Sequence, residues 1–140
     1  MNATINQKIE FLNRPSKLKK KIERMEERAA EYDRLASSPS SPNYETPRVD
    51  GTKSKDAPFL KWIYKLMEIQ EKIEDEKRKY DEVLCETVSA IEKMENEEYK
   101  SVLTYRYINN MLWEEIADAL ETTERTIYRW HRMALDVLEI

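Results

Sequence analysis

The chain has 140 residues, of which 40% are hydrophobic and 37% charged, and its formal net charge at pH 7 is −4. That length allows one ordinary domain, or a small domain with an extended element, while the patterned, highly charged composition argues against both a single compact globule and a disordered chain. Because sheets and hairpins need glycine at their turns, the single glycine predicts an almost entirely helical protein.

No segment of the chain has the composition of a signal peptide or of a membrane span. The first residues lack an uninterrupted apolar stretch, and no later stretch approaches the roughly 20 apolar residues that cross a bilayer. We therefore expect a cytoplasmic protein that does not enter a membrane. The single cysteine, Cys85, has no partner for a disulfide or a zinc site, so we expect a small apolar residue on a helix.

Residues 1–36 are expected to form an N-terminal helical arm. Apolar residues recur every three or four positions from Leu18 to Ala36, as in the seam of a coiled coil. Asn13 is a candidate N-cap, with Pro15 in the first turn, and the segment before it is open to being a separate turn or two of helix. A lysine run suits either the solvated face of a coiled coil or a nucleic-acid patch, the first being commoner: Lys17, Lys19, Lys20 and Lys21.

Residues 37–56 contain three prolines, the only glycine and mostly small polar residues. No helix or strand is expected there, so the segment is interpreted as a flexible loop or linker that lets the chain reverse its direction.

Residues 57–95 are expected to form a long coiled-coil helix that begins after an Asp56 N-cap, with Pro58 in its first turn. Its seam runs from Phe59 to Met94, and Glu76 is the only charged residue in it. Two seams of unequal length joined by a linker predict an antiparallel hairpin, closed within one chain or between chains, with apolar length left over for another subunit. The predicted oligomerisation residues are Phe59, Trp62, Leu66, Ile69, Ile73, Tyr80 and Val83.

Residues 96–140 are expected to form a compact unit of three short amphipathic helices. The first covers Glu97–Tyr107, and asparagine-rich residues that tolerate left-handed backbone end it. The second covers Leu112–Leu120, and the last begins after a Thr123 cap and runs to about Leu138. Two short helices joined by a turn of three or four residues, the second carrying arginines, are typical of a helix-turn-helix.

Helical phase divides the last helix into two faces. Ile127, Ala134 and Leu138, with Trp130 or His131, fall on the packing face, and the opposite face is the one that would meet the DNA major groove. Arg125 and Arg129 suit guanine edges or phosphates, with pairing to nearby glutamates on a solvated helix as the alternative. The predicted DNA-binding residues are Thr123, Glu124, Arg125, Thr126, Tyr128, Arg129 and Arg132.

Nothing in the sequence indicates an enzyme, a cofactor or a metal site. His131 is the only histidine and has no ligand or catalytic partner in this unit. Glu114 and Glu115 are adjacent, so on a helix they point in different directions. There is no glycine-rich phosphate loop and no nucleophile motif.

The C-terminal 45 or so residues resemble the helix-turn-helix of sigma-factor region 4. The matching positions are Trp113–Ala117, Leu120, Ile127 and the Ala134–Leu135 pair. Sigma-like turns usually carry glycine where this chain has Glu121, and a left-handed glutamate costs about 1 kcal/mol. A small hydroxyl residue is also usual where this chain has Leu112. The coiled-coil front half, the serine-proline linker and the YRWH run resemble the late-gene activators of the ArpU and RinA type, from phages of Gram-positive bacteria.

The resemblance implies DNA binding and transcriptional control in a bacterial host cell, with contact to RNA polymerase. The combined prediction is an all-α protein, with a long antiparallel helical hairpin or coiled coil followed by a C-terminal helix-turn-helix, that binds double-stranded DNA as a homo-oligomer, a dimer being favoured. It would activate phage or prophage late genes. Two alternatives stay open: a phage small terminase subunit that binds packaging-site DNA as a ring, and a coiled-coil adaptor that never meets DNA.

Overall fold

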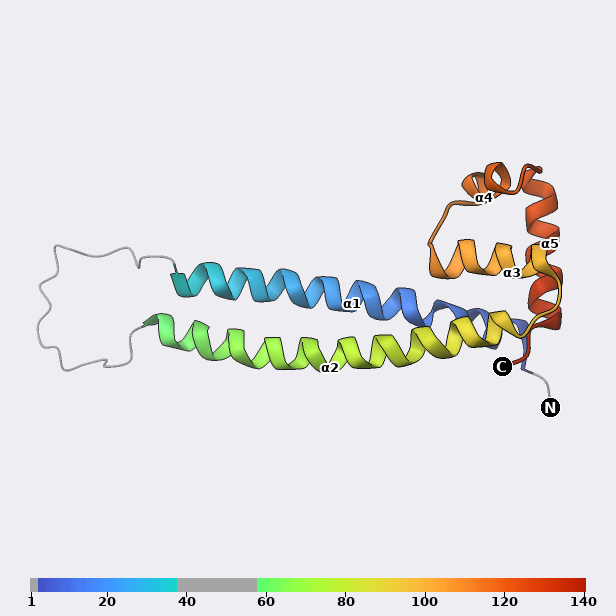
Figure 1. The fold of residues 1–140 in the computed structure, drawn as a ribbon. Coiled ribbons are helices and arrows are strands. Elements are labelled where there is room, and N and C mark those ends of the chain that lie inside the picture. The colour runs from blue at the N-terminus through green and yellow to red at the C-terminus, as the bar shows by residue number, and fades with distance from the viewer. Residues whose placement is uncertain (1–2, 38–57) are drawn as a thin grey trace, which may run out of the picture. The chain divides into compact units, whose positions relative to one another are not determined.

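The computed structural model describes residues 3–37 and 58–140, and within them every regular element is a helix (Figure 1). The elements are α1 (Ile5–Ser37), α2 (Pro58–Glu92), α3 (Glu97–Leu103), η1 (Thr104–Ile108), α4 (Trp113–Ala119) and α5 (Glu124–Val137). The predicted all-α class is therefore confirmed. Ser37 ends α1, while the rest of the predicted linker and the proposed Asp56 cap lie outside the described residues. No described helix combines the length and the apolar content needed to cross a membrane.

The chain forms two compact units that cut across the predicted segment boundaries. The hairpin unit comprises Lys21–Lys77, and the terminal unit comprises Met1–Lys20 together with Arg78–Ile140. α1 and α2 each contribute to both units, and the terminal unit is made from two stretches that are separate in the sequence.

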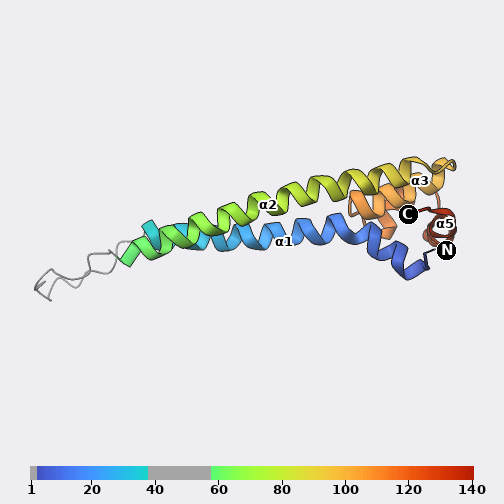
Figure 2. The ribbon, with the colours of Figure 1, turned by 90° about the horizontal axis from the view of Figure 1, so that it is seen from below.

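The hairpin unit pairs the second half of α1 with the first half of α2, side by side and antiparallel (Figure 1 and Figure 2). Its buried apolar residues are Ile22 and Met25 from α1 and Ile69 and Ile73 from α2. The rings of Tyr32 and Trp62 stack with 5.9 Å between their centroids. The two apolar seams expected from the sequence therefore meet each other within one chain, which confirms the predicted hairpin.

α1 begins at Ile5, so the predicted N-cap at Asn13 is wrong. Thr4 and Gln7 form a capping box, in which the Gln7 amide donates to Thr4 Oγ1 at 3.1 Å and the Thr4 amide donates to Gln7 Oε1 at 2.8 Å. Pro15 therefore lies inside the helix, where it cannot donate to the carbonyl of Phe11 four residues earlier. Arg14 Nε donates to that carbonyl at 3.1 Å instead, so the acceptor stays satisfied.

The terminal unit has a core to which α1, α2, α3 and α5 all contribute. Leu12 and Leu103 are fully buried in it. Lys8 is also buried, and its Nζ donates to the carbonyl of Leu135 at 2.8 Å and to that of Asp136 at 3.2 Å, at the C-terminal end of α5. The start of α1 is thus part of the unit that holds the helix-turn-helix.

Candidate nucleic-acid interface

The first helix of the candidate interface is the continuous pair α3 and η1. The Asn96 side chain caps it by accepting from the Tyr99 amide at 3.0 Å. Its last turn widens to a π-helix, in which the Asn109 amide donates to the Thr104 carbonyl at 3.0 Å. Asn110 then ends the helix with a left-handed φ of 55°. The break lies where the asparagines predicted it.

The turn between α4 and α5 has the hydrogen bonds of a Schellman motif. The Thr122 amide donates to the Ala117 carbonyl at 2.9 Å, and the Glu121 amide donates to the Asp118 carbonyl at 3.1 Å. Glu121 has a left-handed φ of 52°, at the position where sigma-like turns carry glycine. The turn therefore keeps its usual geometry without the usual residue.

Thr123 caps α5, as predicted. Its Oγ1 accepts from the Thr126 amide at 3.2 Å and donates to the Thr126 hydroxyl at 3.0 Å. At the start of α4, the Glu115 carboxylate accepts from the Leu112 amide at 2.8 Å. Two of the predicted DNA contacts, Thr123 and Thr126, thus also hold the helix start together.

The inner faces of the three helices share a core of Val102, Ile116, Ala117 and Ile127. Trp113 and Trp130 pack against it as half-buried residues, so both tryptophans have a packing role. α5 packs against both α3 and α4, which fixes the face that it turns outward.

The outer face of α5 carries Arg125, Arg129 and Arg132, and all three are exposed. In the part of the chain that the structure describes, no carboxylate forms an ion pair with any of them. Glu124, a glutamate on the same helix, instead accepts a hydrogen bond of 3.4 Å from the Tyr128 hydroxyl. Tyr128 is 47% exposed at the edge of the same face.

A cluster of aromatic rings borders this outer face. The Trp113 ring lies edge-on to Tyr128, with 5.2 Å between centroids, and to His131, with 4.8 Å. His131 Nε2 and the Tyr107 hydroxyl share a hydrogen bond of 2.8 Å. Burial, and secondarily the positive charge of Arg106, lowers the pKa of His131 to about 4, so the imidazole is neutral at pH 7. His131 is therefore a packing residue, as expected.

Arg106 also contacts this cluster, through interactions that the sequence did not predict. Its guanidinium lies 4.2 Å from the centroid of the Trp113 ring, and its Nη1 donates to the Met111 carbonyl at 2.9 Å. Both partners come after the break at Asn110. Helical spacing gives no signal for a contact made across a break.

The predicted oligomerisation residues lie in several environments. Ile69 and Ile73 are buried in the hairpin unit, and Trp62 stacks on Tyr32 there. Leu66, Tyr80 and Val83 are half-buried, while Phe59 is 43% exposed. Much of the apolar surface assigned to a second subunit is therefore covered by the chain's own α1.

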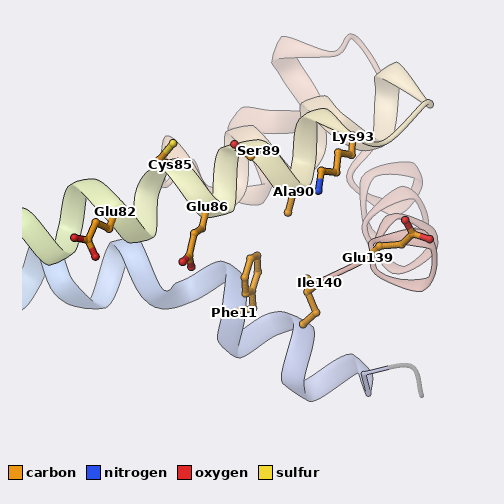
Figure 3. Close-up of a pocket in the computed structure, with 9 residues that line it drawn as sticks. All are labelled: Phe11, Glu82, Cys85, Glu86, Ser89, Ala90, Lys93, Glu139 and Ile140. Atoms are coloured by element: carbon orange, nitrogen blue, oxygen red, sulfur yellow. The ribbon is translucent and has the colours of Figure 1, made fainter.

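A groove of about 660 Å³ lies in the terminal unit, and none of the predicted DNA-binding residues lines it (Figure 3). Phe11, Ala90 and Ile140 give it apolar walls, and carboxylates and one lysine surround them. Cys85, exposed on α2, is at its edge. Arg14 and Glu86 form an ion pair of 2.9 Å beside it.

Comparison with known proteins assigns the chain to a family. No curated protein and no solved structure matches the chain. A family model described as "Protein of unknown function (DUF1492)" matches residues 38–139, a range that contains α2 through α5 and thus the whole helix-turn-helix. Because this match covers well over half of the sequence, the chain belongs to the DUF1492 family.

Proposed function

We propose that the protein is a sequence-specific, DNA-binding transcriptional regulator that inserts α5 into the major groove. The observation that carries the proposal is the outer face of α5, where Arg125, Arg129 and Arg132 are exposed and without ion-pair partners among the described residues. Their opposite face is held in the core by Ile127. A helix fixed on one side, with free guanidinium groups on the other, suits groove binding.

The positions of the three arginines along α5 suit two different roles. Arg125 and Arg132 are seven residues apart, about 10 Å along the helix axis, which corresponds to roughly three steps of 3.4 Å along a DNA strand. Arg125 and Arg129 lie nearer the N-terminal end of α5, the part of a recognition helix that reaches base edges, and suit bidentate contacts to guanine. Arg132 lies further along and suits a phosphate.

The net charge of −4 disfavours approach to DNA, so a second copy would strengthen binding. A single α5 offers few phosphate contacts, and linking two copies raises the effective concentration of the second contact. We therefore propose that the protein acts as a homo-oligomer, most simply a dimer. Two further parts of the proposal, activation of phage or prophage late genes and contact with RNA polymerase, rest on the resemblance to activators of the ArpU and RinA type.

The test compares two double variants of the full chain. DNA fragments selected from a bacterial or prophage genome by the wild-type protein serve as the probe, and binding is measured by fluorescence anisotropy at moderate salt. Arg125→Ala with Arg129→Ala should weaken binding at least tenfold, because each bidentate contact contributes about 1–3 kcal/mol. Arg24→Ala with Arg28→Ala removes two exposed arginines of the same spacing from α1 and should change binding little. Equal affinities for the two double variants would refute the role of α5.

A further inference from the structure

The seam of α2 contains one buried carboxylate, that of Glu76. Glu76 is 8% exposed and is placed among the apolar seam residues of the hairpin unit. Lys21 Nζ of α1 lies 3.1 Å from Glu76 Oε2. A second cross-helix pair, Lys77 with Glu26 at 3.6 Å, lies beside it, and both of its side chains are about half exposed.

A carboxylate at this position is hard to explain by stability alone. Moving a charge out of water is costly, and an apolar side chain of similar volume often stabilises a helical interface as much or more. The best-attested use of a polar residue in a coiled-coil seam is the choice of partner and register. The role of Glu76 therefore depends on which helix packs on the α2 seam: α1, as in the structure, or a helix of a second copy.

The obvious competing partner is α2 of a second copy. A heptad seam as regular as that of α2 suits a parallel, in-register pair of identical helices. In that arrangement the Glu76 carboxylates of the two copies would face each other in the apolar seam, and like charges in such a site repel. α1 instead brings Lys21 to the carboxylate.

We propose that the Lys21–Glu76 pair selects α1, which in the structure is that of the same chain, as the partner of the α2 seam and excludes α2 of a second copy. Ile69 and Ile73 are then contacts of the intrachain hairpin and not of the dimer. A second copy binds elsewhere on the molecule. This inference concerns the hairpin unit alone and does not depend on DNA binding by α5.

Disulfide trapping tests the proposal directly. In a Cys85→Ser background, Ile73→Cys places one thiol in the α2 seam, where it meets its counterpart only if two α2 helices pair in parallel. Under mild oxidation this variant should stay monomeric on non-reducing gels. Adding Glu76→Leu should raise the disulfide-linked dimer several-fold. Equal cross-linking with and without Glu76→Leu, whether high or low in both, would overturn the proposal.

A charge reversal tests the pairing with α1. Glu76→Lys should lower the melting temperature by several degrees, because Lys21 then faces a second cation, and adding Lys21→Glu should restore most of the loss. The matched control reverses the exposed pair, Glu26→Lys followed by Lys77→Glu, and both steps should shift the melting temperature by far less. If Lys21→Glu does not recover the loss caused by Glu76→Lys, the pair does not select α1.

Discussion

Glu121 is a left-handed residue in the turn between α4 and α5. Its φ of 52° places a side chain in backbone that glycine enters freely. The Schellman hydrogen bonds of Thr122 and Glu121 impose this conformation from both sides of the residue. The turn between α4 and α5 therefore keeps its hydrogen bonds at the cost of local backbone strain at Glu121.

Glu121→Gly should relieve that strain. The free energy of unfolding is expected to rise by about 0.5–1 kcal/mol, since the steric relief exceeds the extra backbone entropy that glycine loses on folding. Urea denaturation of the two proteins measures the change. Asn110→Gly, at the other left-handed residue, is the control, and it should gain less because asparagine tolerates this conformation. A less stable Glu121→Gly protein would show that the side chain makes a needed contact.

His131 links stability to pH. Its pKa is about 4 in the folded protein and about 6.5 when unperturbed, so the folded state favours the neutral imidazole. Above pH 6.5 the imidazole is neutral in both the folded and the unfolded state, so its protonation does not lower the free energy of unfolding there. As the pH falls from 6.5 to 4, only the unfolded state gains the proton, and the free energy of unfolding decreases.

The decrease from His131 should be on the order of 1 kcal/mol, after allowing for solvent screening at this half-buried site. Urea denaturation at pH 7.5 and pH 5.0 measures it. His131→Gln removes the titrating group while keeping a polar side chain beside Tyr107. The loss between the two pH values should therefore be smaller in the variant, and an identical loss in both proteins would exclude His131 as the cause.

Among the elements, α1 has the role least apparent from the family match. That match begins at residue 38, after the end of α1, yet Leu12 is fully buried in the core of the terminal unit and Lys8 holds the last carbonyls of α5. The start of α1 therefore supports α5 from the far end of the sequence.

Leu12→Ala should lower the free energy of unfolding by about 2–5 kcal/mol, because it leaves a cavity in a closed core. Ile5→Ala, at a residue 39% exposed on the same helix, should cost much less. Circular dichroism during thermal unfolding distinguishes them. Similar losses in both variants would mean that the start of α1 is only loosely attached.

The sequence predicts those features that depend on the spacing of residues along a single helix. The two heptad seams, the Thr123 cap and the two faces of α5 all follow from spacing along one helix, and the structure has them. The sequence places the start of α1 too late, because Pro15 suggests a helix start, whereas the helix begins at Ile5. The Thr4 and Gln7 pair has the spacing of a capping box, which is a local sequence signal for a helix that begins at Ile5. The rescue of the Phe11 carbonyl by Arg14, and the stacking of Arg106 on Trp113, depend on side-chain positions that no periodicity encodes.

At the scale of the whole molecule, two units share two long helices. Each unit draws residues from before and after the segment 38–57. Loss of order in α1 would therefore remove part of both cores at once. We expect the described helices to unfold with more cooperativity than two independent units would.

The shared helices have a consequence for a chain that has been cut. A single protease cleavage engineered between residues 38 and 57 would give two fragments. Each fragment would contain some of the buried residues of both units. We expect the fragments to stay bound to each other without a covalent link and to co-elute as one species in gel filtration. Leu12→Ala should loosen that association. Expressed separately, the two pieces would then be the halves of a split protein, and α5 would reach its folded form only when both are present.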